Sequence, residues 1–186
     1  MKFNYLPLVS LLLTGSAFAN EHKQFNYVEL SAGFVSDYDF GHLYGHGVAG
    51  QYSMLENLYL AGAFEYWTEE DFDYYISDIG IGTKFEVVQY VIPFVQANFR
   101  YGHTEDNRWD ESYHGKSYIL NYGIAGNISR VHYKLGINRY FHEGWSQNDN
   151  YEFAEVFVSI TDWLSVGAKL ENTPDETIQV GVRYNF

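Results

Sequence analysis

The sequence predicts an all-β protein, a transmembrane antiparallel up-and-down β-barrel, and three observations lead to this prediction. Aromatic residues make up 19% of the 186-residue chain, with 18 Tyr, 14 Phe and only 3 Pro, and this composition favours strands. Apolar and polar residues alternate through almost all of the chain after residue 20. The chain also begins with the features of an export signal.

Residues 1–19 are predicted to be a signal peptide. Lys2 supplies the positive charge, residues 6–13 the apolar core, and Ala17-Phe18-Ala19 an A-x-A cleavage site. The core has about eight residues, too few for a membrane helix, which needs about 20. We therefore expect residues 20–186 to form one exported barrel domain. Cysteine is absent, which excludes disulfides, thiolate metal sites and lipoprotein acylation.

The first five predicted strands span residues 27–37, 43–53, 58–67, 74–85 and 90–101. Each has apolar side chains at every second position and small or polar ones between them. In 27–37, Val28, Leu30 and Phe34 alternate with Glu29 and Gly33. The corresponding apolar positions in the next four strands include Tyr44 and Val48, Leu60 and Phe64, Ile79 and Ile81, and Val95 and Phe99.

The last five predicted strands span residues 117–128, 131–141, 151–160, 163–171 and 177–186. All ten segments have about 9 to 13 residues, close to the roughly 9 to 11 that a tilted strand needs to cross a bilayer. The apolar positions of this half include Leu120 and Ile124, Leu135 and Ile137, Val156 and Val158, Val166 and Leu170, and Val180 and Val182.

The connections between these segments alternate in length. Short turns are predicted at 54–57, 86–89, 129–130 and 161–162, and longer acidic loops at 37–42, 68–73, 102–116, 142–150 and 172–176. In bacterial outer-membrane barrels the short turns are periplasmic and the longer loops extracellular. An even number of strands then places both termini in the periplasm.

A soluble β-sandwich or a lipocalin-like barrel would also show alternation. Two features favour the membrane barrel. The polar positions are rich in Gly, Ala, Ser and Asn, which suit a crowded lumen. Aromatic residues gather near the segment ends, where the interfacial girdles of membrane barrels lie; they include Tyr44, Tyr52, Tyr66, Phe85, Tyr101, Tyr118, Phe141, Tyr184 and Phe186.

Residues 79–85 (IGIGTKF), residues 122–126 (YGIAG) and the last strand resemble the small outer-membrane β-barrel proteins of Gram-negative bacteria, the OmpA/OmpX-like and opacity-type group. The resemblance implies a monomer in the cell outer membrane that contacts membrane lipid and lipopolysaccharide. Many members have eight strands, so eight is the alternative to ten. The resemblance also implies that the barrel-assembly machinery recognises the last strand through Ile178, Val180, Val182, Tyr184 and Phe186.

Charged residues on the inward-facing positions are of both signs and nearly balance. Because buried charges are tolerated when they are paired, we expect them to form a network that fills the lumen. The alternative is a narrow path for water or ions, left open by the inward glycines and alanines. The predicted lumen network comprises Glu29, Glu65, Asp78, Lys84, Arg100, Lys134, Glu155, Lys169 and Arg183.

The net charge of −13 lies mainly in the longer loops, which repel nucleic acid and attract cations. Glu69, Glu70, Asp71 and Asp73 are the best candidates for surface cation binding, although they lack the spacing of a calcium loop.

Five histidines gather toward the outer rim: His42, His46, His103, His114 and His142. Imidazoles there could bind a metal or act as general bases beside Ser112, Ser117 or Ser146. Without fixed motif spacing, we predict no catalytic residue, cofactor or dedicated metal site.

These observations predict a non-enzymatic outer-membrane barrel with a structural, adhesive or surface-interaction role. Trp109, Tyr113, Trp145 and Tyr151 lie in or beside the two largest predicted loops and are candidates for an adhesive surface. One alternative is a narrow porin-like channel for water or small cations. A third hypothesis is a hydrolase at the rim that acts on lipid A or peptides.

Overall fold

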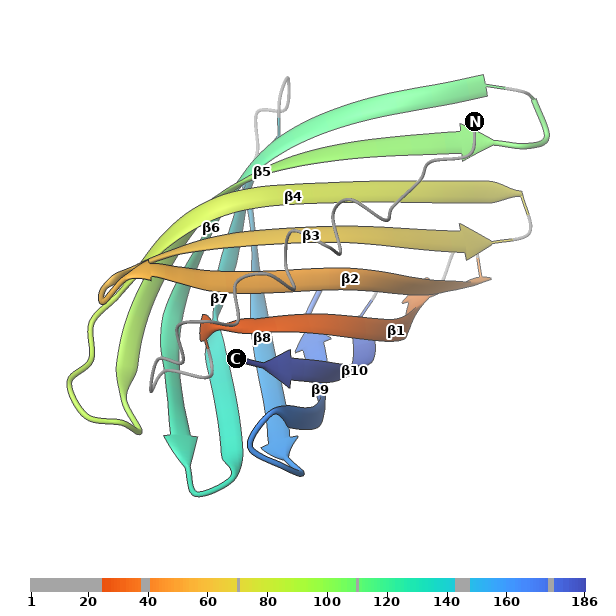
Figure 1. Ribbon diagram of the computed structural model, residues 1–186. Helices are drawn as coiled ribbons and strands as arrows, with labels where there is room; N and C mark the ends of the chain where they lie inside the picture. The colour runs from red at the N-terminus through yellow and green to blue at the C-terminus, as the bar shows by residue number, and fades with distance from the viewer. Residues whose placement is uncertain (1–24, 38–40, 70, 110, 143–147, 174–175) are drawn as a thin grey trace.

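The computed structural model is a closed antiparallel β-barrel of ten strands, each paired with its neighbours in chain order (Figure 1). The structure describes residues 25–37, 41–69, 71–109, 111–142, 148–173 and 176–186. The predicted signal peptide lies outside these ranges. The strands are β1 (Tyr27–Asp37), β2 (Gly41–Leu55), β3 (Leu58–Glu69), β4 (Phe72–Lys84), β5 (Ile92–Asp106), β6 (Glu111–Ile128), β7 (Val131–His142), β8 (Asn148–Ser159), β9 (Leu164–Glu171) and β10 (Thr177–Asn185).

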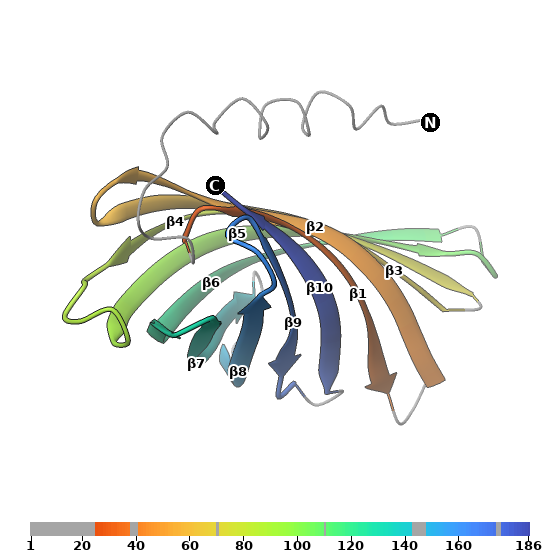
Figure 2. The ribbon, with the colours of Figure 1, turned by 60° about the horizontal axis from the view of Figure 1, so that its bottom comes forward.

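The first and last strands close the barrel. Tyr27 pairs with Asn185 and Val35 with Thr177, so β1 and β10 run side by side along their length (Figure 2). Closure gives every strand two neighbours and leaves no sheet edge, as a barrel in lipid requires. The predicted fold class is confirmed, and the strand number is ten rather than eight because β9 pairs with both β8 and β10.

The strands extend further than predicted at the end away from the short turns. β5 continues to Asp106 and β6 begins at Glu111, so the predicted loop at 102–116 is mostly a paired hairpin (Figure 1). Its ladder includes Gly102 opposite Gly115. The sequence prediction of a long loop was wrong because cross-strand backbone pairing continues where neither face is apolar. Beyond the lipid, the alternation of apolar and polar residues ends, but the strands remain hydrogen-bonded to each other.

The outward-facing side chains form an apolar surface with aromatic residues at both ends. Leu30 is 66% exposed, Ile79 67% and Val180 59%, as expected of side chains that face lipid. Near the short turns, the Tyr184 ring contacts those of Trp163 and Phe186 in tilted arrangements, at ring-centroid distances of 6.2 and 6.3 Å. At the other end, neighbouring strands contribute a continuous row of rings, which comprises His46, Tyr66, Tyr75, His103, His114 and Tyr101.

No helix among the described residues is long and apolar enough to cross a membrane.

The compact apolar core lies inside the barrel, at the end that carries the short turns. Phe25 and Tyr59 have no exposed surface, and Phe94 has 3%. Ile92 and Ala125 complete this cluster, against which Phe153 packs. The sequence prediction assigned aromatic residues to the lipid face and did not anticipate an aromatic core on the inward face.

The same substitution at two glycines of β6 should have different effects on the free energy of unfolding. A Cβ at Gly123 would lie 2.0 Å from the Leu135 carbonyl oxygen and 2.6 Å from the Gly136 Cα, whereas at Gly115 nothing lies within 4 Å. We expect Gly123→Ala to lower the free energy of unfolding by about 1–3 kcal/mol, because backbone must move, and Gly115→Ala to leave it unchanged. Urea unfolding of the refolded barrel in detergent measures both, and equal effects would contradict the register of β6 and β7.

Candidate functional site: the barrel lumen

A buried ion network occupies the lumen where β1, β8, β9 and β10 meet. Glu29 is fully buried, and its Oε2 accepts a hydrogen bond of 2.7 Å from Arg183 Nε. Lys169 Nζ lies 2.8 Å from Glu29 Oε1, in an ion pair that is not aligned as a hydrogen bond. Arg183 Nη2 also donates to Glu155 Oε2 at 2.5 Å. The two carboxylates and two cations therefore neutralise each other, with Glu29 and Arg183 buried and Glu155 and Lys169 partly exposed.

Aromatic rings cover three cations at the same end of the barrel. The Arg183 guanidinium lies 3.5 Å from the Phe157 ring centroid, and the Lys84 and Lys134 ammonium groups lie 4.6 and 4.9 Å from that of Phe25. Such contacts are favourable, especially when the cation is desolvated. Together with the buried core they form a layer across the lumen, which we call the floor. The floor comprises Phe25, Tyr27, Tyr59, Phe94, Phe157, Lys84, Lys134 and Arg183.

Above the floor lies a cavity of about 570 Å³, which we call the cup. It extends from Tyr27 and Phe94 at the floor to His142 and Thr177 at the outer ends of the strands. Its volume is within the range of small-molecule sites. The lumen thus holds packed side chains at the end with short turns and is hollow toward the other end.

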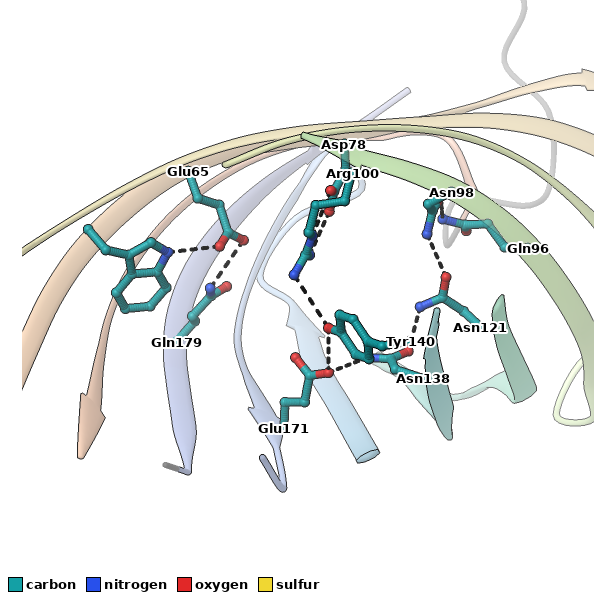
Figure 3. Close-up of polar contacts among 11 residues, drawn as sticks. Glu65, Asp78, Gln96, Asn98, Arg100, Asn121, Asn138, Tyr140, Glu171 and Gln179 are labelled. Atoms are coloured by element: carbon teal, nitrogen blue, oxygen red, sulfur yellow. Dashed lines mark hydrogen bonds and ion pairs between the residues drawn. The ribbon is translucent and has the colours of Figure 1, made fainter. Parts of the chain in front are cut away.

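A second ion network lines the cup (Figure 3). Arg100 donates to both oxygens of Asp78, from Nε at 2.8 Å and from Nη2 at 2.7 Å, in the bidentate geometry that guanidinium groups favour. Arg100 Nη1 also donates to the Tyr140 hydroxyl at 3.4 Å, and that hydroxyl donates to Glu171 Oε1 at 2.9 Å. Four strands are joined in this way through the middle of the lumen.

Amide side chains form a hydrogen-bonded ladder around the wall of the cup (Figure 3). Each amide offers a donor and an acceptor, so the ladder satisfies its members without charge. Representative contacts are Gln96 Nε2 to Asn98 Oδ1 at 2.7 Å and Asn98 Nδ2 to Asn121 Oδ1 at 2.5 Å. The ladder comprises Gln51, Gln96, Asn98, Asn121 and Asn138, and it ends on Glu171.

Glu65 on β3 accepts hydrogen bonds from a side chain two residues along the same strand and from one on β10 (Figure 3). Trp67 Nε1 donates at 3.0 Å and Gln179 Nε2 at 3.2 Å. The Trp67 indole lies against Gly45, where a Cβ would be 2.3 Å from Trp67 Cδ2. A glycine at position 45 therefore makes room for the largest side chain in the lumen.

The structure places all nine charged residues of the predicted lumen network on the inward face. Arg100 and Asp78 contact each other, Glu29 and Glu155 contact Arg183, and the remaining members contact polar or charged lumen side chains. The sequence prediction omitted Tyr140 and Glu171, which complete the second network. Tyr140 has the same parity as Asn138, and Glu171 the same parity as Lys169, so alternation in the sequence indicates that both face inward. Tyr140 is an aromatic residue and Glu171 ends its strand, and neither feature suggests a lumen charge network.

Among the residues that the structure describes, the predicted surface cation candidates do not converge. Asp71 contacts Arg108 at 3.5 Å, and Asp73 accepts hydrogen bonds from Tyr66 at 2.6 Å and Asn107 at 3.2 Å. Glu70 lies outside the described residues. Within the ranges that the structure describes, no group of three or more His, Cys, Asp or Glu side chains is arranged to hold a metal ion.

No family model matches the sequence, and no curated protein matches it either. Solved structures match the fold. The β domain of the Bordetella autotransporter BrkA is 12% identical with a TM-score of 0.53, covering 86% of this chain and 98% of that one. The KdgM porin is 11% identical with a TM-score of 0.50, covering 86% and 99%. Neisserial surface protein A is 14% identical with a TM-score of 0.48, covering 86% and 96%.

Identities this low establish a shared fold and nothing finer. The chain has the fold of the outer-membrane β-barrels, and its outward face is apolar as lipid requires.

Removing one member of the buried ion network should be costly. In Glu29→Ala, Arg183 and Lys169 lose the carboxylate that lies between them, and we expect the free energy of unfolding to fall by about 3–5 kcal/mol. Glu56→Ala, in an exposed two-residue turn, is the control and should change it by less than about 0.5 kcal/mol. Urea titration of both refolded variants tests this, and similar midpoints would show that the network is not stabilising.

Proposed function

We propose that this chain is a sealed, non-enzymatic outer-membrane barrel that acts at the outer face, in a structural, adhesive or surface-interaction role. The observation that carries this proposal is the floor. Phe25 and Tyr59 are fully buried across the lumen, and the floor cations are covered by aromatic rings or held in ion pairs. A solute that enters the cup meets this layer before it reaches the periplasmic end.

The charge balance of the lumen supports the same proposal. A pore that selects ions has an excess of one sign along its wall. Among the described side chains of the floor, the ion networks and the cup, five carboxylates accompany five cations. Three of each form ion pairs, and the other four contact neutral polar side chains. The carboxylates and cations are Glu29, Glu65, Asp78, Glu155 and Glu171 against Lys84, Arg100, Lys134, Lys169 and Arg183.

Planar-bilayer recording tests whether the floor seals the barrel. We expect the refolded wild-type protein to be silent and Phe94→Ala to open measurable conductance, because the substitution removes an inward ring from the floor. Phe99→Ala is the matched control, since Phe99 lies on the same strand with its ring on the lipid face, 36% exposed. Steady conductance from the wild-type protein would overturn the sealed barrel.

Such a result would favour the second candidate function, a narrow channel for water or small cations. The specific observation behind it is the depth of the cup, which reaches Tyr27, Phe94 and Lys134 at the floor. Only the aromatic layer separates this cavity from the periplasmic end. Movement of one or two of its rings would then be the gate.

The rim carries one arrangement with the residue types of a hydrolytic triad. Ser117 Oγ lies 2.9 Å from His142 Nδ1, and His142 Nε2 lies 3.4 Å from Asp149 Oδ2. However, Ser117 sits within β6 and pairs with Arg100 on one side and His142 on the other. The ladders on both sides engage the backbone N–H groups that an oxyanion hole would need. This supports a structural role for Ser117, His142 and Asp149.

The partners of the barrel follow from its surface. We propose that the apolar belt contacts outer-membrane lipid and lipopolysaccharide, that the acidic outer ends exclude nucleic acid, and that the barrel is a monomer. We also propose that the barrel-assembly machinery recognises the last strand. Its alternate side chains face outward, and they are Ile178, Val180, Val182, Tyr184 and Phe186.

The terminal aromatic provides a direct test of recognition. We expect Phe186→Ala to reduce the fraction of folded barrel in growing cells several-fold, because the assembly signal loses its last residue. Phe85→Ala is the control, because Phe85 is 55% exposed and follows the short-turn end of β4. Heat-modifiable mobility on gels gives the folded fraction. Equal losses in both variants would assign Phe186 to the aromatic girdle alone.

A further inference from the structure

Two histidines face each other on the outer surface of the β5–β6 hairpin. His103 and His114 are directly opposite in register. Their rings stack with centroids 4.6 Å apart and an angle of 19° between planes, and their Nδ1 atoms are 3.1 Å apart. The His103 side chain is 23% exposed, and His114 is exposed. The pair lies on the outer side of Tyr101 and Tyr118, in the part of the hairpin that the sequence prediction had assigned to a loop.

Two neighbouring side chains set the state of these rings. Glu105 Oε1 lies 3.0 Å from His103 Nε2. In the neutral tautomer whose Nε2–H donates to this carboxylate, the lone pair of the ring is on Nδ1. The Tyr101 hydroxyl lies 2.7 Å from His114 Nδ1. A carboxylate that holds the far nitrogen of an imidazole is the usual partner of a metal-binding histidine, where it fixes the tautomer and raises ligand basicity.

We propose that His103 and His114 bind a divalent transition-metal ion through their Nδ1 atoms, with copper(II) bound most tightly. Metal to nitrogen bonds of about 2.0–2.1 Å bring two adjacent ligand nitrogens to about 3 Å from each other, the separation already present here. Each ring turns about its Cβ–Cγ bond to direct its lone pair at the ion. Imidazole suits copper, zinc and nickel, and carboxylate oxygens suit magnesium and calcium.

Water and the Tyr101 hydroxyl would occupy the other coordination positions of the bound ion. The described residues provide no third histidine or carboxylate arranged to complete a closed site. Affinity should therefore follow the general order of divalent metals, in which copper(II) exceeds both nickel and zinc. The bound ion would join β5 to β6 outside the membrane and stabilise the hairpin, because it binds the folded hairpin and not the unfolded chain.

Copper(II) itself is the probe for the experiment. The refolded barrel in detergent is titrated with copper(II), followed by calorimetry and by electron paramagnetic resonance, which reports coordinated nitrogens. We expect a site whose two nitrogen ligands are imidazoles and which excess magnesium does not affect. We expect His103→Ala and His114→Ala each to abolish this site, and Glu105→Gln to weaken it about 10–100-fold. Heat-modifiable mobility confirms that each variant is folded.

The control is His132→Ala, because His132 lies near the opposite end of the barrel, where it contacts Asn127 and Ser159. It should bind copper(II) as the wild-type protein does. If the wild-type protein binds no copper(II), or if the His103 and His114 variants bind it equally well, the site does not exist. Retention of full affinity in Glu105→Gln would overturn the role of the carboxylate. Competition by magnesium would show a carboxylate site instead.

Discussion

The requirement that every backbone amide be hydrogen-bonded within the chain governs this structure. Lipid offers no partner to an exposed N–H or C=O group, so a sheet in the membrane has to close. The seam between β1 and β10 does this, from Tyr27 opposite Asn185 to Val35 opposite Thr177. Once the ring is closed, the two-residue period of each strand divides all side chains between lipid and lumen. The outward and inward chemistries then follow from parity.

Register determines which inward charges meet. Glu29 is directly opposite Arg183, Asp78 opposite Arg100, and Glu155 opposite both Lys134 and Lys169. Residues directly opposite on one face have adjacent Cβ atoms, so these charges neutralise each other at little conformational cost. The ion networks are in this sense a consequence of the hydrogen-bond ladder. They also oppose slippage, because a shift by one residue would send every paired charge into lipid.

Alternation in the sequence was enough to predict the fold class, the number of strands and the nine charged lumen residues. It was not enough to locate the outer ends of β5 and β6, because the apolar signal stops at the lipid boundary and the ladder continues past it. The contact of Arg100 with Tyr140 joins strands that are not neighbours, so it depends on the tilt and size of the closed barrel. The floor could not be predicted in the same way, because parity shows that Tyr59 faces inward but not that it packs with Phe25 and Phe94, which lie far from it in the sequence.

The two ends of the barrel differ in a way that assigns them different tasks. At the turn end, large rings and covered cations pack inside the lumen and stabilise the barrel, and under our proposal they also form its barrier. At the other end the lumen widens into the cup and two strands continue into water. There, His103 and His114 occupy the outward-facing positions of β5 and β6, which hold apolar side chains in the lipid-facing part of the same strands. Both histidines are compatible with an aqueous surface. If the barrel is sealed as we propose, residues that can meet an external ligand are concentrated at this end, and the floor separates them from the end with the short turns.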